Sequence, residues 1–243
     1  MLITDKKILL IGGTGTLGKH IRSLVECHFP NRYELDITNL KSCIDAREKY
    51  RPDIVIHDGA WTDMIGAELY KEDCWKINVT GTENVAKTFF QSKIVYISTE
   101  FVFDGEKGNY KESDLPHPIN FYSLTKLLGE IIIRQYPHHL IIRTAYCPDG
   151  PWSHSVAYID QWSSHEFASV IAPDIAKAAI MDDLEGIIHI AGERKSAYEL
   201  AKSVNSRVGS AYITSSPVRL PRDTSLNSSK WKKILSQQNL ARK

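Results

Sequence analysis

The sequence has few cysteines, and none of them are arranged for pairing. It contains neither a Cys-x-x-Cys motif nor a cysteine-histidine cluster with zinc-ligand spacing, and its four cysteines are Cys27, Cys43, Cys74 and Cys147. Such wide spacing argues against a disulfide framework and against a structural metal site. We therefore predict free thiols in a reducing compartment and no bound metal.

Long apolar runs and an excess of one charge are also missing. The formal net charge is +1, which provides no strong attraction for nucleic acid or for acidic membranes. No window approaches the roughly twenty apolar residues that a membrane span requires. The apolar run near the amino terminus is too short for a signal peptide and leads directly into glycines. We expect a cytoplasmic protein that binds neither nucleic acid nor membrane.

The remaining pattern is that of one large α/β unit. With 243 residues and 42% hydrophobic content, the chain can bury a large core, and no repeat, linker or low-complexity tract divides it. Apolar strand patterns alternate with amphipathic helix patterns, which predicts a Rossmann-type doubly wound parallel sheet. We expect strands at 6–11, 53–57, 93–98 and 186–190, helices at 17–27, 39–49, 72–91, 121–134, 173–183 and 197–204, and then a polar tail.

We also predict how the chain divides. Residues 1–145, continued by 173–192, are expected to form the main core, which carries the glycine-rich loop described next. Residues 146–172 and 193–243 are expected to form a small, reduced lobe in the same compact unit.

A glycine-rich loop joins the first predicted strand to the first predicted helix. Gly12, Gly15 and Gly18 give the form G-x-x-G-x-x-G, with Thr16 and Leu17 inside it. Glycines let the backbone approach a pyrophosphate, and the amino end of the helix directs N–H groups toward it. Because the loop follows a strand and opens a helix, it predicts dinucleotide binding.

The next segment, 28–36, has room only for a short strand. Asp36, followed by Ile37, could bind the adenosine ribose of NAD(H), whereas Arg32 could accept the 2′-phosphate of NADP(H). Alternatively, Asp36 caps or turns the chain ahead of the next helix and Arg32 is an exposed charge. We lean slightly to NADP(H) over NAD(H).

Tyr122 and Lys126 share one face of the predicted helix 121–134, at positions i and i+4. A neighbouring cation stabilises phenolate and lowers the pKa of a tyrosine, which would make Tyr122 a proton donor. Thr99 ends the preceding strand and could bind the same substrate oxygen, so the three predict carbonyl reduction. Tyr198 and Lys202 repeat the spacing but follow neither a strand ending in Ser-Thr nor a nucleotide-binding loop.

Together these residues resemble the extended short-chain dehydrogenases/reductases and, within them, the dTDP-4-dehydrorhamnose reductase family. The matching pieces run from near residue 8 to near residue 230, and they are GGTGTLG, LDIT, RPDIVIHDGAWT, INVTGTENVA, ISTEFVFDG, YSLTKLLGE, IIRT and PRDTSLNSSK. The resemblance implies NAD(P)H-dependent reduction of the 4-keto group of a nucleotide-linked 6-deoxy sugar, in rhamnose or a related pathway.

The resemblance also implies roles for individual residues. Tyr122 would donate the proton, Lys126 would hold the nicotinamide ribose, Thr99 would orient the keto oxygen, and Asn78 would maintain the proton-relay helix. Ala60, Trp61 and Thr62 would flank the cofactor. The residues expected to meet the sugar nucleotide are Glu100, Val102, Phe103, Arg143, Tyr146, Trp152 and Arg222.

The sequence departs from the family pattern on its substrate side. Glu100 replaces an aspartate, and His57-Asp58 replaces a more usual Asn-Ala pair. Compared with typical members of the family, the chain lacks a helix between Thr144 and Asp160. The segment around this deletion contains aromatic and histidine residues instead: Trp152, His154, Tyr158, Trp162 and His165. These form either a reshaped pocket or a hydrophobic cover over the sheet.

Two functions stay open. One is the sugar-nucleotide reductase, with a homodimer as a possible assembly. The other is a non-catalytic, NADP-binding regulatory protein that binds a partner enzyme, like the beta subunit of methionine adenosyltransferase.

Overall fold

A five-stranded parallel sheet forms the centre of the protein. In the computed structural model, which describes residues 1–241, the strands are ordered β1-β2-β3-β4-β9 and every neighbouring pair is parallel. The strands are β1 (Ile8–Ile11), β2 (Ile54–His57), β3 (Lys93–Thr99), β4 (His139–Thr144) and β9 (Gly186–His189). Each pairing joins strands separated by a helical crossover, as in doubly wound folds.

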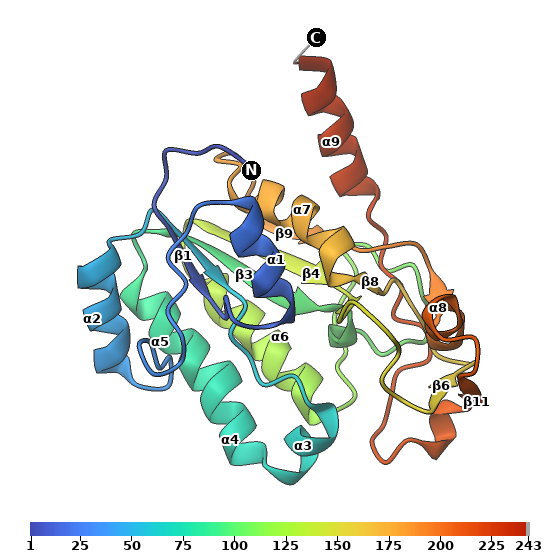
Figure 1. Ribbon diagram of the computed structural model, residues 1–243. Coiled ribbons are helices and arrows are strands. Elements are labelled where there is room, and N and C mark those ends of the chain that lie inside the picture. Colours follow the sequence, from blue (N-terminus) through green and yellow to red (C-terminus); the bar gives the residue numbers. More distant parts are fainter. Residues whose placement is uncertain (242–243) are drawn as a thin grey trace.

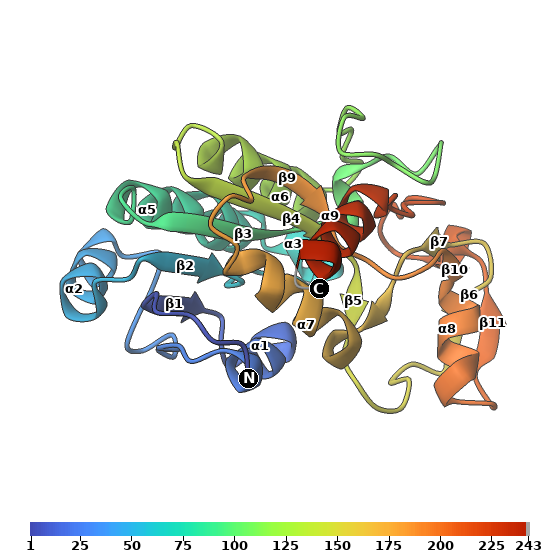
Figure 2. The ribbon, with the colours of Figure 1, turned by 90° about the horizontal axis from the view of Figure 1, so that it is seen from above.

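Helices cover both faces of this sheet (Figures 1 and 2). On one face, α1 (Thr16–Leu24) and α7 (Ala168–Ala179) lie against each other. On the other lie α2 (Leu40–Tyr50), α5 (Gly81–Thr88) and α6 (Phe121–Ile133). The predicted Rossmann-type architecture is therefore confirmed.

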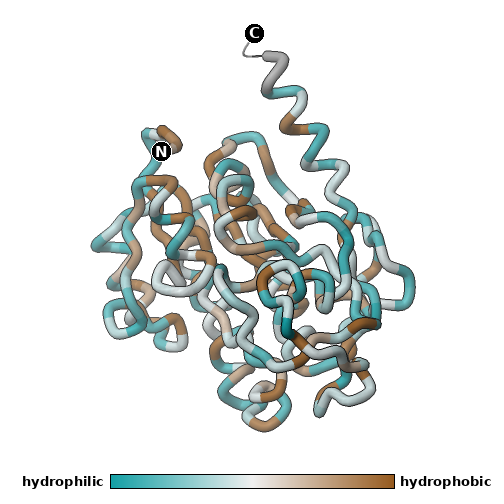
Figure 3. Tube along the Cα trace, turned by 45° about the vertical axis from the view of Figure 1, so that its right-hand side comes forward, coloured by the Kyte–Doolittle hydropathy of each residue, from teal (hydrophilic) through white to brown (hydrophobic). Residues whose placement is uncertain are grey.

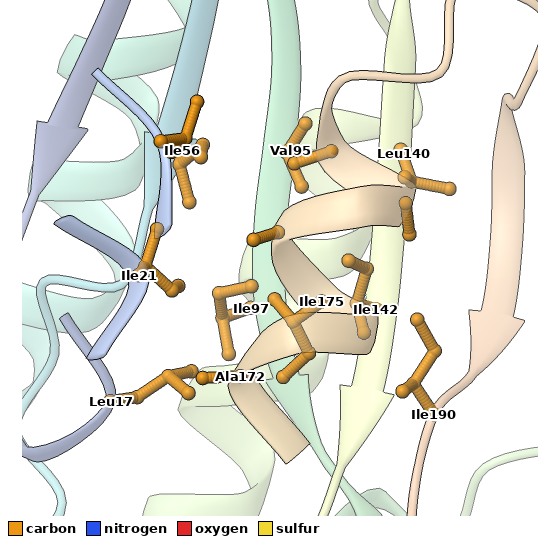
Figure 4. Close-up of a cluster of buried hydrophobic side chains, with 14 of the residues drawn as sticks. Leu17, Ile21, Ile56, Val95, Ile97, Leu140, Ile142, Ala172, Ile175 and Ile190 are labelled. Atoms are coloured by element: carbon orange, nitrogen blue, oxygen red, sulfur yellow. The ribbon is translucent and has the colours of Figure 1, made fainter. Parts of the chain in front are cut away.

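The sheet is buried on both faces, which explains why its strands read as continuous apolar runs. Figure 4 shows Leu17 and Ile21 of α1 and Ile175 of α7 meeting Val95 and Ile142 of the central strands. Strand residues that point the other way pack against α2, α5 and α6. Apolar segments accordingly gather inside the trace, under a more hydrophilic exterior (Figure 3).

Most predicted elements are found, with differences at specific points. The segment 28–36 forms no named strand among the described residues, and His28 makes only an isolated parallel bridge to Leu9. The predicted helix 72–91 is divided into α4 (Lys71–Trp75), a π-helical turn η1 (Lys76–Thr80) and α5. Helix α7 begins at Ala168, so that Pro173 lies inside the helix rather than at its start.

Other elements were not anticipated. Strand β4 was recognised only as a motif, and the predicted polar tail includes α9 (Ser229–Ala241), whose Trp231 is buried against the α1–α7 face. Helix α9 extends away from the body in Figure 1. The remaining unpredicted elements are α3 (Met64–Leu69), the 3-10 turns η2 (Glu100–Val102) and η3 (Ile213–Ser215), and several two- or three-residue strands.

Most of these short strands lie with α8 (Ala197–Val204) at one end of the molecule, whereas one pair lies closer to α7 (Figure 2). They form three pairs: β5 (Tyr146–Cys147) with β8 (Glu166–Phe167), β6 (Val156–Tyr158) with β11 (Gly209–Ala211), and β7 (Trp162–Ser163) with β10 (Lys195–Ser196). In the structure, short strands and loops alone lead from β4 to α7, within the described part of the chain. The division into core and lobe stays a prediction.

No helix within residues 1–241 is both long enough and apolar enough to cross a bilayer.

Candidate active site

A pocket of about 610 Å³ opens at the carboxyl ends of the central strands, beside the glycine-rich loop. Ligands bind at this edge in doubly wound sheets, because the connections after the strands diverge there. Its walls come from the loop before α1, from the ends of β2, β3 and β4, from α6 and from the segment after β4. Of the predicted residues it contains Gly15, Thr16, Ala60, Thr62, Thr99, Glu100, Tyr122, Lys126 and Tyr146.

Thr99, Tyr122 and Lys126 meet on one wall of this pocket. Asn120 caps α6 by accepting a hydrogen bond from the Ser123 amide at 2.9 Å, which starts the helix so that Tyr122 and Lys126 lie one turn apart. Thr99 lies close enough to act on the phenol of Tyr122, whose pKa it lowers. The spacing in the sequence therefore corresponds to a real cluster.

The ammonium of Lys126 is held by strand β3. It donates to the Ile97 carbonyl at 2.8 Å and lies 4.1 Å above the ring of Tyr96. Burial lowers the pKa of Lys126 to about 8, although Asp58 and Glu130 act in the opposite direction. Burial also raises the pKa of Tyr122 above its ordinary value, and only Thr99 offsets this. This is opposite to the direction expected from the spacing, because desolvation is the largest effect and the charges that act on the phenol, those of Asp58, Cys74 and Glu100, raise its pKa further.

Asn78 connects the loop after β2 to helix α6. Its amide oxygen accepts from the Trp61 N–H at 2.7 Å, and its amide nitrogen donates to the Trp61 carbonyl at 3.0 Å and to Thr125 Oγ1 at 2.9 Å. The residue is buried within the π-helical turn η1, a distortion that often accompanies functional sites. The indole of Trp61 turns back to the Asp63 carbonyl, so Trp61 contributes to this junction rather than to the pocket lining.

The glycine loop has the shape of a phosphate cradle. Gly12 has φ +88°, and a Cβ there would lie 2.7 Å from the Asp58 carbonyl carbon. A Cβ on Gly18 would lie 2.3 Å from the Gly12 oxygen. Side chains at these positions would collide with the backbone of the loop itself and of the segment after β2, so the tight turn that opens α1 requires glycine, as the turn of a dinucleotide-binding loop does. Leu17, by contrast, points into the core.

The residues proposed to select the cofactor lie outside the pocket lining. The Asp36 carboxylate accepts from the Thr38 amide at 2.9 Å and from the Thr38 hydroxyl at 2.8 Å. It therefore holds the turn before α2, the alternative considered from the sequence. Ile37 packs in the core against α5, and Arg32 is exposed.

Five of the predicted substrate residues are also not brought to the pocket. Val102 and Phe103 lie in a buried cluster in which Phe103 stacks on Tyr110. Arg143 is buried in an ion pair with Glu130, with 2.7 Å between Nη2 and Oε2. Trp152 and Arg222 are outside the lining as well, and Trp152 packs beside Tyr198. The pair of Tyr198 and Lys202 thus lies in α8, away from the pocket.

Asp58 and His165 line the pocket without having been assigned to the site. Asp58 receives a hydrogen bond from the Tyr146 hydroxyl at 3.4 Å, and burial raises the pKa of its carboxyl to about 7. His165 lies beside Glu100, with 3.3 Å between Nδ1 and Oε1. The sequence did carry a signal for both residues, namely a departure from the family pattern at Asp58 and the histidine-rich segment around His165.

A parallel sheet covered by helices on both faces, with a polar pocket and a glycine loop at the carboxyl ends of its strands, defines a Rossmann-type α/β protein. Residues 6–150 match the family described as the RmlD substrate binding domain. The chain belongs to this family, and the resemblance seen in the motifs is confirmed.

Individual relatives agree with this assignment. The dTDP-4-dehydrorhamnose reductase of Aggregatibacter actinomycetemcomitans is 32% identical over 152 residues, which are 58% of this chain and 51% of that protein. The match thus spans about half the length of this relative.

A crystal structure from Sulfolobus tokodaii, described as a hypothetical dTDP-4-dehydrorhamnose reductase, is 33% identical, with a TM-score of 0.84 and 95% coverage of both chains. The methionine adenosyltransferase 2 subunit beta of Bos taurus is 23% identical, over 94% of this chain and 82% of its own length.

Proposed function

We propose that the protein is an NAD(P)H-dependent reductase of the 4-keto group of a nucleotide-linked 6-deoxy sugar. The observation that carries this proposal is the meeting of Thr99, Tyr122 and Lys126 in one pocket beside a glycine loop shaped for phosphate. Sequence relatives named dTDP-4-dehydrorhamnose reductase support this substrate class and a place in dTDP-rhamnose biosynthesis.

The proposed roles follow from the geometry. The loop of Gly12, Gly15 and Gly18 holds the pyrophosphate, and Lys126 holds the nicotinamide ribose. A bound nicotinamide cofactor supplies the hydride that reduces the carbonyl carbon. Tyr122 gives its proton to the developing alkoxide, and Thr99 hydrogen-bonds the same oxygen and fixes its position.

Because burial raises the pKa of Tyr122, the phenol keeps its proton at neutral pH and the proton is present for transfer to the alkoxide. The same shift makes the phenol a weaker acid, so efficient transfer requires the pKa to fall when cofactor and substrate bind. Asn78 is a positioning residue in this proposal, because it bonds both to α6 at Thr125 and to the loop that contains Ala60, Trp61 and Thr62.

We infer a preference for NADP(H) over NAD(H). The Asp36 carboxylate accepts two hydrogen bonds from Thr38 through Oδ1, which hold it in the turn before α2 and outside the pocket lining. Arg32 is exposed and available to a 2′-phosphate. A homodimeric assembly and a cytoplasmic location remain predictions from the sequence.

Replacing Tyr122 by Phe tests the reaction. In an assay of NADPH and NADH oxidation with a panel of nucleotide-linked 4-keto-6-deoxy sugars, we expect Tyr122→Phe to lose at least about 100-fold in kcat, because it lacks the proton donor. Affinity for the cofactor should persist. The matched control is Tyr198→Phe, which changes the second Tyr-x-x-x-Lys pair in α8 and should keep full activity. Undiminished turnover by Tyr122→Phe would rule out the mechanism.

The second candidate is a non-catalytic NADP-binding protein that regulates a partner enzyme. The match to a methionine adenosyltransferase subunit over 94% of this chain supports it, as does the absence of a helix between β4 and α7 in the described residues. The panel separates the two proposals. Cofactor binding without oxidation by any sugar would favour the regulatory function.

A further inference from the structure

His165 lies in the turn between β7 and β8, on the wall of the pocket that also contains Thr99 and Tyr122. Its side chain is 26% exposed, so the ring is mostly enclosed but reaches the pocket. The roles proposed above do not use this residue. Its position beside the reacting groups makes it a candidate for contact with the substrate.

The imidazole is held through one nitrogen. Nδ1 hydrogen-bonds the Ser163 hydroxyl and lies 3.3 Å from Glu100 Oε1. The same hydroxyl accepts from the His165 amide at 3.1 Å, and Glu100 Oε2 accepts from the Ser164 amide at 3.3 Å. Ring and turn are therefore fixed together, and the ring orientation does not depend on a bound ligand.

The burial of Glu100 indicates that the contact between Glu100 and His165 has a role beyond packing. Its side chain is fully buried, and Oε1 has no hydrogen-bond partner of good geometry among the described residues. Burying an incompletely bonded carboxyl costs stability. The buried Glu100 carboxyl lies directly beside the His165 ring, so it is well placed to hold that ring in position for a ligand in the pocket.

The uncharged state of the His165 imidazole limits which functional groups of a ligand it can bind. Burial lowers the pKa of His165 to about 4, so the ring carries no charge at neutral pH and offers one donor and one acceptor nitrogen. With Nδ1 engaged, Nε2 is the nitrogen left for the pocket. A hydroxyl group both donates and accepts, so it can pair with Nε2 in either tautomer, whereas a carbonyl or phosphate oxygen pairs with only one.

We propose that His165 is a specificity-determining residue whose Nε2 hydrogen-bonds a hydroxyl group of the sugar being reduced, with Glu100 and Ser163 as positioning residues. This inference rests on the proposed function for the identity of the sugar. Loss of one such hydrogen bond in an enclosed site is expected to cost about 10-fold to 100-fold in affinity.

Two substitutions separate substrate contact from support of the turn. The amide of His165→Gln reaches the place of Nε2, and the amide of His165→Asn reaches the place of Nδ1. We expect His165→Asn to keep the contacts with Ser163 and Glu100 and a normal melting temperature, but to raise KM for the sugar about 10-fold to 100-fold. His165→Gln should keep more of the sugar affinity, while kcat and affinity for NADPH change little in both.

A surface histidine supplies the control. His138 also places Nδ1 beside a carboxylate, 3.2 Å from Glu185, but it is exposed and precedes β4 at the opposite end of the strand from the pocket. His138→Asn should leave KM unchanged. If His165→Asn binds sugar normally and His165→Gln is the impaired variant, the ring supports the turn only and the inference is overturned.

A binding measurement distinguishes this inference from the proposed function. Calorimetry with the NADP⁺-loaded protein would compare a dTDP-linked 6-deoxyhexose with dTDP alone, for the wild type and both variants. If no sugar is reduced but the predicted order of affinities holds, the proposed reaction fails and the inference stands. If sugars are reduced but the variants bind them equally, the inference fails alone. If the sugar-linked nucleotide binds no better than dTDP, the inference is overturned.

Discussion

Arg143 and Glu130 form a buried ion pair that joins β4 to α6. Nε and Nη2 of the guanidinium donate to the two carboxylate oxygens at 2.9 and 2.7 Å, and Ser98 Oγ donates to Oε1 at 2.5 Å. Both side chains are almost fully buried, at 2% and 1% exposed. The guanidinium also lies 5.1 Å from the centre of the Phe103 ring. We expect this pair to act on stability rather than on the substrate.

The expected loss of stability can be worked out for a variant that removes one partner of the ion pair. Arg143→Met leaves the Glu130 carboxylate buried with only Ser98 for compensation, which should lower the free energy of unfolding by about 3–5 kcal/mol. In a protein of this size, that corresponds to a fall in melting temperature of roughly 6–20 °C. The double variant Glu130→Met/Arg143→Met removes both charges and should be less destabilised than the sum of the single variants.

Chemical and thermal denaturation measure these differences, with a surface pair as the control. Glu83 and Lys87 are an exposed i,i+4 pair on α5, 2.6 Å apart, so Glu83→Gln should cost no more than about 0.5 kcal/mol. A loss below about 1 kcal/mol for Arg143→Met would refute the structural role. A raised KM for the sugar at a temperature where this variant is fully folded would instead support the substrate contact expected from the sequence.

Two further predictions concern pH and the glycine loop. Burial raises the pKa of Glu100 to about 8, so the folded protein binds a proton more tightly than the unfolded chain does, and the stability contributed by this group is lost as pH rises from about 4.5 through 8. In Glu100→Gln this part of the decline should be absent. The difference in free energy of unfolding between wild type and variant, measured by denaturation, should therefore shrink or change sign between pH 5 and 8.5, and a constant difference would contradict this. Gly18→Ala should weaken NADPH binding at least about 10-fold and lower the melting temperature, because its Cβ would lie 2.3 Å from the Gly12 oxygen. Gly15→Ala is the milder comparison, with a closest contact of 3.1 Å, and equal NADPH affinities measured by fluorescence titration would refute the steric argument.

Local sequence patterns were sufficient for most of the sheet and for the reactive wall of the pocket. The buried strands are continuous apolar runs, and the i, i+4 spacing of Tyr122 and Lys126 survives because α6 is regular from Phe121 onward. The glycine loop could also be recognised from the sequence, because its close contacts are made within a few residues of the chain and with the segment directly after β2.

Long-range contacts set the parts that the sequence did not predict. Nothing local to Arg143 shows that its partner is Glu130 on α6, or that the ammonium of Lys126 turns to the Ile97 carbonyl. The short strands after β4 pair with segments distant in the chain, as β6 does with β11, so periodicity within them carries little information. His165 reaches the pocket only because that region folds back onto the end of β3 beside Glu100.

The π-helical turn around Asn78 also acts as a mechanical link. A π turn accommodates one more residue than an α-helical turn, and here it holds a side chain that bonds to the Trp61 backbone and to α6 at once. Deleting one residue within 76–80 would therefore restore a regular α-helical turn and take the Asn78 side chain out of its place between its two partners. The loop 60–62 and helix α6 would then lose the side chain that joins them. If the roles proposed for this loop and for Tyr122 are right, NADPH binding and turnover should fall together in such a deletion, which paired measurements of both would show.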